Sequence, residues 1–396
     1  MTDALRGTRE SPNASCATLL APLVSEFGAA RVELRMYHTP NLTGVRKTYI
    51  PKRINEGWGL QHMKLYGIDD EIIMSGANLS EDYFTNRQDR YHLFSSKDIT
   101  DYFYQIQQAI GSLSFRVVPN QDLQEGFQLE WPAENAAPSP LKSPADYVKH
   151  AESLIAPLIQ PHREPQSSIT DTSVYPLSQL TQLLRSDKST ELPAITTILK
   201  TLAAPAFQKS RWTFTAGYFN PDPSLKNLLI NSKSSSGTVV TASPWANGFY
   251  GSKGVSGLLP PAYTLLSRRF LEGVQRAGRG SSIVLKEWRR GTVGEPGAWT
   301  YHAKGFWVTM PGDINPSITL IGSSNYTKRS YSLDLEVNAL VVTKNEGLQK
   351  RLGAEEAWLQ QYAKEVTVDD FAKMDRRVGL RVRIAMWIVS LVGGAL

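Results

Sequence analysis

The feature that most restricts the fold and the chemistry of this chain is a short polar motif that occurs twice. A histidine and a lysine stand two residues apart as His62 and Lys64, and again as His302 and Lys304. On a β-strand, residues two apart point to the same face, so we expect each pair to present both side chains to one site. The chain contains only six histidines, and two copies of one pattern therefore indicate an internal duplication.

Each copy is followed by further polar positions in the same order. A turn of small residues ends in Asn78 after the first motif and in Asn325 after the second. Eleven residues beyond each asparagine stands an acid, Asp89 in the first copy and Glu336 in the second. One copy alone is typical of a half-exposed strand, whereas the pair favours an active site. Because each copy has a single histidine, we expect the two halves to meet at a pseudo-twofold axis.

These residue types suit the transfer of a phosphoryl group. A neutral imidazole can attack phosphorus while a second, protonated imidazole gives a proton to the leaving oxygen. Lysines and asparagines supply positive charge and hydrogen-bond donors to the phosphoryl oxygens. An acid bonded to the far ring nitrogen fixes the tautomer of each imidazole. The predicted catalytic residues are His62, Lys64, Asn78, Asp89, His302, Lys304, Asn325 and Glu336.

The repeated motif resembles the signature of the phospholipase D superfamily, in which H-x-K is followed by an aspartate and by a G-S-x-N-like turn. The first copy matches in full with Asp69, whereas Thr309 stands at the position of the aspartate in the second copy. Asp69 is a further candidate catalytic residue, which we interpret as structural because some lipid-synthesising branches have lost one of these acids. The resemblance implies an α/β fold of two pseudo-symmetric halves, each a mixed sheet flanked by helices, with one shared active site at their interface.

Several stretches resemble one branch of this superfamily, the eukaryotic mitochondrial CDP-diacylglycerol–glycerol-3-phosphate 3-phosphatidyltransferases. The stretches are residues 37–40, 56–64, 82–91, 217–220 and 247–251. The resemblance implies that His62 attacks the β-phosphorus of CDP-diacylglycerol, that His302 protonates departing CMP, and that glycerol 3-phosphate then accepts the phosphatidyl group. It implies no required cofactor or metal, although divalent cations can assist phosphate binding, and it implies a place at the mitochondrial inner membrane.

Two loops are candidate substrate-binding segments. A basic loop with Lys52 and Arg53 precedes the first motif, and its alternative interpretation is a solvated loop. The glycine-rich loop 243–254 could cradle a phosphate with its backbone N–H groups, although it lacks the spacing of an ATP-binding loop and could be an ordinary turn. The candidate residues in this second loop are Asn247, Gly248, Gly251 and Lys253.

Three other functions remain open: a phosphatidylserine synthase, a phosphodiesterase or nuclease, and a non-catalytic lipid-binding protein. A net charge of +6 favours anionic partners, and nucleic acid is among them, although the branch-like stretches argue against it. A phosphatidylserine synthase of the same superfamily would use the same donor with serine as acceptor. A phospholipase D-type phosphodiesterase would use water. A non-catalytic lipid-binding protein would bind lipid without releasing CMP.

The predicted organisation has four parts. Residues 1–130 form the first half, in which the strand and helix that normally come first are expected to be missing. Residues 131–170 are a Pro/Ala/Ser-rich connection, and residues 171–375 form the second half. The tail, residues 376–396, is basic and then apolar, and we expect it to contact an anionic membrane surface rather than to span a bilayer. A C-terminal helix packed on the domain is the alternative.

The local pattern predicts where the motifs lie. Alternation predicts strands over residues 62–66 and 300–308, which carry the two motifs, and another strand over 212–219. Helical spacing of apolar residues predicts helices over 99–115, 144–159, 175–184, 193–203 and 260–274.

Overall fold

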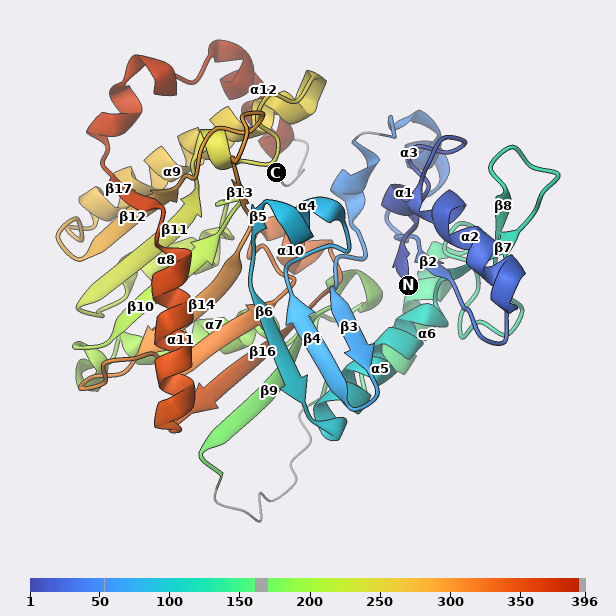
Figure 1. Cartoon of the computed structure of the whole chain (residues 1–396), viewed down its shortest axis with the longest axis horizontal. Helices are drawn as coiled ribbons and strands as arrows, with labels where there is room; N and C mark the ends of the chain where they lie inside the picture. The colour runs from blue at the N-terminus through green and yellow to red at the C-terminus, as the bar shows by residue number, and fades with distance from the viewer. Residues whose placement is uncertain (53, 161–169, 392–396) are drawn as a thin grey trace.

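The computed structural model describes residues 1–52, 54–160 and 170–391, with side chains described as far as Trp387. Its largest element is an eight-stranded mixed sheet in the second half, with helices on both faces (Figure 1). The strands follow the order β17, β12, β11, β10, β14, β15, β16 and β9. Their bounds are β9 (Thr172–Gln179), β10 (Arg211–Ala216), β11 (Ser236–Ala242), β12 (Ile283–Trp288), β14 (Lys304–Thr309), β15 (Ile318–Gly322), β16 (Glu336–Thr343) and β17 (Ala363–Val366).

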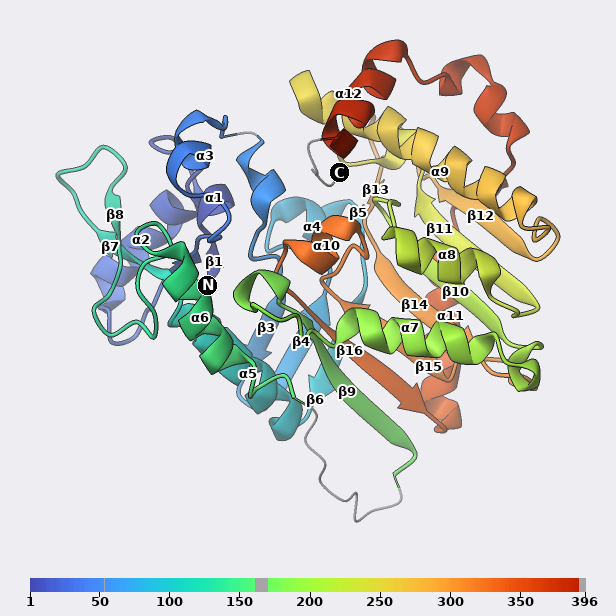
Figure 2. The same cartoon turned by 180° about the vertical axis from the view of Figure 1, so that it is seen from behind.

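Helices cover both faces of this sheet, and its central strands are buried on both faces. In β10 every residue after Arg211 is buried, as expected for a strand between two helical layers. Helix α11 (Glu346–Leu359) lies on one face of the sheet. The other face carries α7 (Glu191–Leu202), α8 (Pro223–Asn231) and α9 (Leu259–Arg276) (Figure 2).

The prediction of a helix over residues 175–184 was wrong. Strand β9 occupies residues 172–179, and a 3₁₀ turn, Thr181–Leu183, follows it. Strand β9 pairs in antiparallel register with β16, from Thr172 opposite Thr343 to Gln179 opposite Glu336. Strand β9 is the edge of the sheet, where Pro176 is tolerated although it cannot donate a backbone hydrogen bond.

The first half contains two smaller sheets. A four-stranded sheet has the order β1, β2, β7, β8, and a three-stranded sheet has the order β3, β4, β6. The bounds are β1 (Thr2–Asp3), β2 (Arg35–Tyr37), β3 (Leu65–Ile68), β4 (Glu71–Ser75), β6 (Tyr91–Ser95), β7 (Phe115–Pro119) and β8 (Phe127–Glu130). In the second half, β10 pairs with both β11 and β14 and so holds one continuous sheet together. In the described part of the first half, no strand lies between β1 and β3, and the two smaller sheets stay separate.

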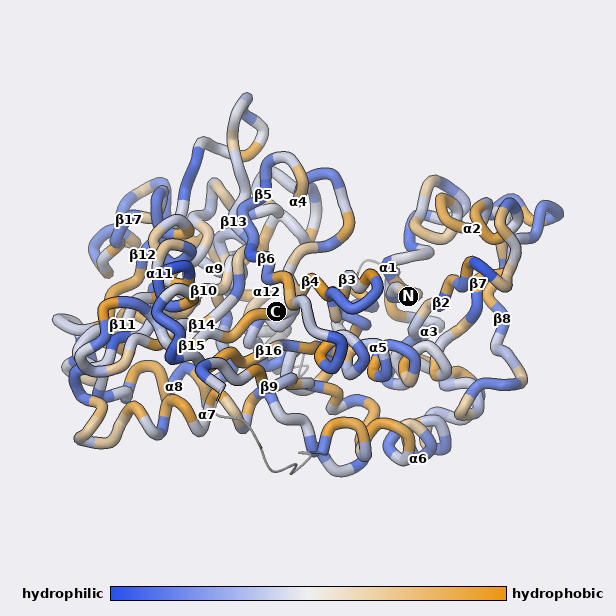
Figure 3. The backbone as a smooth tube through the Cα atoms, turned by 60° about the horizontal axis from the view of Figure 1, so that its bottom comes forward, coloured by the Kyte–Doolittle hydropathy of each residue, from blue (hydrophilic) through white to orange (hydrophobic). Residues whose placement is uncertain are grey.

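The helices of the first half close its core. They are α1 (Ala4–Gly7), α2 (Cys16–Phe27), α3 (Gly44–Tyr49), α4 (Glu81–Thr85), α5 (Lys97–Gly111) and α6 (Pro144–Ile155). Apolar and polar residues alternate along α5 and α6 (Figure 3), and their apolar sides pack on each other through residues such as Phe103, Ile106 and Tyr147. Helix α6 therefore packs into the core of the first half, although we expected a separate connection there. Residues 161–169 of that connection lie outside the described part.

The two halves meet through symmetric backbone contacts. Strand β5 (Arg87–Gln88) pairs in parallel with β13 (Thr300–Tyr301), and Gln61 forms an isolated parallel bridge with Leu335. The motif histidines come directly after these contacts, and the two motif strands therefore begin at later residues than predicted. They start at Leu65 and Lys304, because His62 and His302 bond to the opposite half instead.

Arg90, in the first half, forms hydrogen bonds with several residues of the second half. Its side chain is fully buried and donates to both carboxylate oxygens of Glu355 at 3.0 and 2.9 Å, and to the carbonyl oxygens of Lys304 and Leu320 at 3.1 and 2.8 Å. The guanidinium also lies 3.8 Å from the ring centre of Trp307. Burial alone would raise the pKa of Glu355, but Arg90 and His92 hold that pKa well below its usual range.

We expect Arg90→Ala to destabilise the fold strongly, because it leaves the Glu355 carboxylate without its main partner. Breaking one side of a buried ion pair costs about 3–5 kcal/mol. Chemical denaturation followed by tryptophan fluorescence measures this loss. Arg116→Ala is the matched control, since Arg116 pairs with Glu134 on the surface and its loss should cost less than about 1 kcal/mol. Equal effects of the two substitutions would contradict the role of Arg90.

The last helix among the described residues is α12 (Leu380–Leu391), which packs on α9 through Val382 and Met386. In the described ranges we find no helix with the length and apolar character needed to cross a membrane.

Candidate active site

Each motif histidine is hydrogen-bonded to the acid of the other half. The Nδ1 atom of His62 lies 2.8 Å from Oε1 of Glu336, and the Nδ1 atom of His302 lies 2.7 Å from Oδ2 of Asp89. All four residues are buried. When the Nδ1–H group donates to a carboxylate, a neutral imidazole carries its lone pair on Nε2. The crossed pairs therefore leave two Nε2 atoms to act on a substrate.

Backbone hydrogen bonds hold the two pairs in equivalent positions. The N–H of His62 donates to the carbonyl of Leu335 at 3.0 Å, and the N–H of His302 donates to the carbonyl of Gln88 at 2.8 Å. Leu335 and Gln88 each precede the acid that contacts the same histidine. The geometry around one motif thus repeats around the other, as the duplication predicts.

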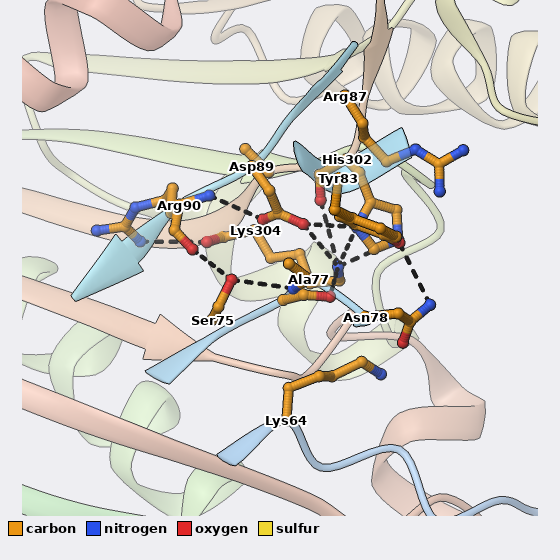
Figure 4. Close-up of polar contacts among 12 residues, drawn as sticks. Lys64, Ser75, Ala77, Asn78, Tyr83, Arg87, Asp89, Arg90, His302 and Lys304 are labelled. Carbon is orange, nitrogen blue, oxygen red and sulfur yellow. Dashed lines mark hydrogen bonds and ion pairs between the residues drawn. The ribbon is translucent and has the colours of Figure 1, made fainter. Parts of the chain in front are cut away.

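The two lysines lie beside the histidines. Lys64 Nζ donates to the carbonyl of His62 at 2.6 Å, and Lys304 Nζ donates to the carbonyls of His302 and Gly76 at 3.2 and 3.3 Å. Figure 4 shows Lys304 converging with Asp89 on His302, where its Nζ lies 2.8 Å from the ring Nδ1. A Cβ at Gly76 would come within 2.6 Å of Lys304 Nζ, so the small residue makes room for the cation.

Of the two asparagines, Asn78 lies beside the residues around His302. Asn78 Nδ2 is 3.5 Å from the hydroxyl of Tyr83, which is itself 3.3 Å from both ring nitrogens of His302. The side-chain oxygen of Asn325 is buried and has no hydrogen-bond partner among the described residues.

The structure does not bring Asp69 to the cluster. Asp69 lies at the exposed turn between β3 and β4, with a φ of 51°, a conformation that aspartate and asparagine tolerate better than most residues. This position agrees with a structural role. Lys52 is exposed in the loop before the first motif, and Arg53 lies outside the described residues.

The glycine-rich loop reaches the site at one position. A Cβ at Gly248 would lie 3.1 Å from both Arg87 and the hydroxyl of Tyr218, so this glycine lies against the wall of the cluster. Asn247 is buried and its side chain accepts from the N–H of Phe249, which shapes the turn. The other two candidates, Gly251 and Lys253, are exposed.

Three aromatic and basic residues around His302 did not emerge as candidates from the motif. The rings of Tyr83 and Tyr218 meet His302 edge to face, with centroids 5.2 and 5.3 Å away. The guanidinium of Arg87 lies 4.6 Å above the ring of Tyr83. Their only sequence signal is their position within the polar and aromatic stretches 82–91 and 217–220.

The environment of the histidines favours neutral imidazoles. Burial, together with the positive charges of Lys64 and Arg6, lowers the pKa of His62 well below its ordinary value. Burial and the charge of Lys304 lower the pKa of His302 to about 3, against the opposing effect of Asp89. Without an anion in the site, both imidazoles are therefore neutral near pH 7.

The pKa values of the two acids, Asp89 and Glu336, are shifted in opposite directions. Burial alone would raise the pKa of Asp89, but Lys304 and the hydrogen bond with His302 outweigh it and lower that pKa. Burial raises the pKa of Glu336, and the attraction of Lys64 only partly offsets it. Burial also lowers the pKa of Lys304 to about 8. In the part of the chain that the structure describes, no group of three or more His, Cys, Asp or Glu residues is arranged to hold a metal ion.

Comparisons with known proteins identify relatives of this chain. No family model matches the chain. The chain is 46% identical to the CDP-diacylglycerol–glycerol-3-phosphate 3-phosphatidyltransferase of Saccharomyces cerevisiae, over 98% of this chain and 76% of that protein. It is 39% identical to the protein of that name in Schizosaccharomyces pombe, over 94% and 80%. It is 33% identical to the human mitochondrial protein, over 98% and 70%.

Among solved structures, the chain is similar to the phosphatidylserine synthase of Haemophilus influenzae Rd KW20. The TM-score is 0.69 with 19% identity, over 99% of this chain and 79% of that chain. The likeness confirms the predicted phospholipase D-like α/β fold. The chain belongs to the family of CDP-diacylglycerol–glycerol-3-phosphate 3-phosphatidyltransferases.

Proposed function

We propose that this chain transfers the phosphatidyl group of CDP-diacylglycerol to glycerol 3-phosphate, giving phosphatidylglycerophosphate and CMP. The observation that carries the proposal is the crossed arrangement of His62 with Glu336 and His302 with Asp89, in a chain of this family. Two imidazoles that each bond to an acid through Nδ1 can supply a nucleophile and an acid or base through Nε2.

In the first step, Nε2 of His62 attacks the β-phosphorus of CDP-diacylglycerol. A nitrogen–phosphorus bond forms, and the bond from that phosphorus to the oxygen of CMP breaks. CMP leaves with the electron pair, and His302 gives it a proton. The product is a phosphatidyl group bound covalently to His62. Neutral His62 is ready for this attack because burial lowers its pKa.

In the second step, the 1-hydroxyl of glycerol 3-phosphate attacks the same phosphorus. His302, now neutral, takes the proton of the hydroxyl, and the bond between His62 and phosphorus breaks. Lys64, Lys304, Asn78 and Asn325 supply charge and donors to the phosphoryl oxygens in both steps. The predicted roles of Asp89 and Glu336 are to orient the two imidazoles.

The charge of the site supports anionic substrates. Four cationic side chains, those of Lys64, Arg6, Lys304 and Arg329, are close enough to His62 to lower its pKa. A phosphate entering the site brings negative charge, which favours the charged form of a neighbouring imidazole. Substrate binding therefore raises the pKa of His302 and prepares it as the general acid.

The acceptor assay tests this function. Purified protein in detergent micelles is given CDP-diacylglycerol with glycerol 3-phosphate, with serine or with neither, and CMP and lipid products are followed. We expect phosphatidylglycerophosphate to form only with glycerol 3-phosphate. Phosphatidylserine, or CMP released at the same rate without an acceptor, would instead make the chain a phosphatidylserine synthase or a phosphodiesterase. Lipid binding without CMP release would make it a non-catalytic lipid-binding protein.

The pH dependence of kcat/KM reports the ionisation of the free protein. Protonated Lys304 is needed to stabilise the phosphoryl oxygens, and its pKa is lowered to about 8. Burial lowers the pKa of Lys64 well below its ordinary value as well. We therefore expect kcat/KM to fall as the pH rises, no later than about pH 8, by at least about tenfold per unit. Because the pKa of neutral His62 is lowered, the acid limb should lie well below pH 6.5. An alkaline limb near the ordinary lysine value of about 10 would contradict this environment.

The names of two relatives suggest a cellular location for this chain. The mouse and human relatives are named mitochondrial, and we propose that this chain also acts at the mitochondrial inner membrane. Its substrate is a lipid, so the site needs access to an anionic membrane surface. Nucleic acid is not among the proposed partners. Divalent cations can assist phosphate binding, although the proposed steps use only side chains of this chain.

A further inference from the structure

A cationic cavity lies away from the histidines. It has a volume of about 250 Å³ and lies between α9 and the segment that leads into α12. Figure 2 shows α12 crossing beside α9 at the top of the molecule. Four arginines line the cavity, together with the aromatic ring of Phe371: Arg268, Arg376, Arg377 and Arg383.

Two of these arginines are neutralised within the chain. Arg268 pairs with Glu272 at 2.9 Å, and Arg376 forms a bidentate pair with Glu287 at 2.7 and 2.5 Å. Arg377 and Arg383 are exposed and form no ion pair with any described residue. Guanidinium groups bind phosphate oxygens through a planar, often bidentate fork. The cavity therefore presents two uncompensated phosphate-binding groups.

Helix α12 carries apolar residues on two sides. Val382 and Met386 pack on α9. Leu380, Ile384 and Trp387 follow each other at helical spacing on the outer side, where they are 71%, 47% and 63% exposed. Apolar residues on the solvent side of a helix, bordered by basic side chains, are typical of helices that lie in a membrane interface.

We propose that the arginine cavity binds the phosphate headgroup of an acidic glycerophospholipid while Leu380, Ile384 and Trp387 enter the same bilayer. The inference deepens the proposed function, because an enzyme with a lipid donor must reach a membrane. Charge complementarity favours a lipid over a second copy of this chain, whose net charge of +6 would be repelled. Basic residues beside an apolar helix strengthen binding to anionic lipid.

This headgroup site also shares an element with the candidate active site. Helix α9 forms one wall of the cavity and carries Tyr263, whose ring stacks on Tyr218 with centroids 5.5 Å apart. Tyr218 in turn contacts the ring of His302. A lipid held at the cavity therefore lies on the same helix that supports the wall around His302.

Vesicle sedimentation tests the proposal. Protein with all 396 residues of this chain is mixed with vesicles of phosphatidylcholine alone or with phosphatidic acid added. We expect wild-type protein to prefer the acidic vesicles. Arg377→Ala should weaken this binding about fivefold, and the Arg377→Ala/Arg383→Ala variant about 30-fold. The charge-matched control Arg31→Ala/Arg351→Ala removes two exposed arginines elsewhere and should weaken binding by less than about threefold. Thermal unfolding checks that each variant is folded.

Four outcomes decide the proposal. Equal losses in the cavity variant and the control would overturn it, because only general charge would then matter. Inorganic phosphate that saturates the cavity while acidic vesicles bind no better than neutral ones would indicate a free-phosphate site and would also overturn it. A dimer in sedimentation velocity that Ile384→Ser abolishes would indicate a second copy as the partner. Weaker vesicle binding by Ile384→Ser in a monomeric protein would support the lipid.

The experiments distinguish a failure of the proposed function from a failure of this inference. His62→Ala should bind acidic vesicles as tightly as wild-type protein although it releases no CMP. If wild-type protein binds acidic vesicles through Arg377 and Arg383 but makes no lipid product, the proposed function is wrong and the headgroup site stands. If product forms in micelles while the cavity variant binds vesicles normally, only the headgroup site is wrong.

Discussion

His302→Ala is expected to release one equivalent of CMP rapidly and then to stop. CMP is a phosphate monoester with a second pKa of about 6, so it leaves without much help from a general acid. The hydroxyl of glycerol 3-phosphate is a poor nucleophile without a base, so the second step needs His302. We expect steady-state kcat to fall by at least about 10⁴-fold, the scale seen when a catalytic pair loses one member. Rapid-quench measurement of CMP separates the burst from turnover.

His62→Ala should behave differently, because it lacks the nucleophile. We expect neither a burst of CMP nor turnover above about 10⁻⁴ of the wild-type rate. His150→Ala is the control, since His150 is exposed on α6 and its Nδ1 bonds only to the backbone of its own helix. A CMP burst in His62→Ala with none in His302→Ala would reverse the proposed roles.

Asp89→Asn should impair turnover more than Glu336→Gln. The pKa of Asp89 is lowered, so Asp89 is an anion that fixes the Nδ1–H tautomer of His302 and stabilises its charged form. An amide at this position can present N–H instead of oxygen, which favours the wrong tautomer. A comparable change in a serine protease costs about 10⁴-fold, and we expect about 10³–10⁴-fold here.

Glu336→Gln should cost only about 10–100-fold. Burial raises the pKa of Glu336, so the wild-type residue already tends toward the neutral form that glutamine imitates. Values of kcat/KM for both variants at one pH measure the difference. Asp69→Asn should stay within about twofold of wild type, since Asp69 lies at an exposed turn. Equal losses in the two acid variants would contradict the asymmetry between the halves.

The duplicated motif predicted the main geometry of the site. Two histidines with one acid each required the halves to meet, and the crossed bonds from His62 to Glu336 and from His302 to Asp89 now show how they do so. The matching spacing in both copies carried this information. Their catalytic roles stay predictions until the variants are measured.

Other features depend on contacts that a local pattern does not contain. Residues 175–184 have helical spacing, but β9 forms because β16 offers a full antiparallel partner more than 150 residues later. No part of the duplicated motif marks Arg90, and only the fold brings Glu355 to it across the interface. Tyr218 follows strand β10 and contacts the ring of His302, but it lies outside the duplicated motif.

The most direct test is to trap the covalent intermediate. His302→Ala is exposed briefly to CDP-diacylglycerol that carries radioactive phosphorus in its phosphatidyl group, quenched in alkaline detergent, and digested to peptides. We expect the label on the peptide that contains His62, with acid-labile behaviour typical of a nitrogen–phosphorus bond, and its release as phosphatidylglycerophosphate when glycerol 3-phosphate and an added imidazole base are supplied. Label retained by His62→Ala protein would show that another residue is the nucleophile.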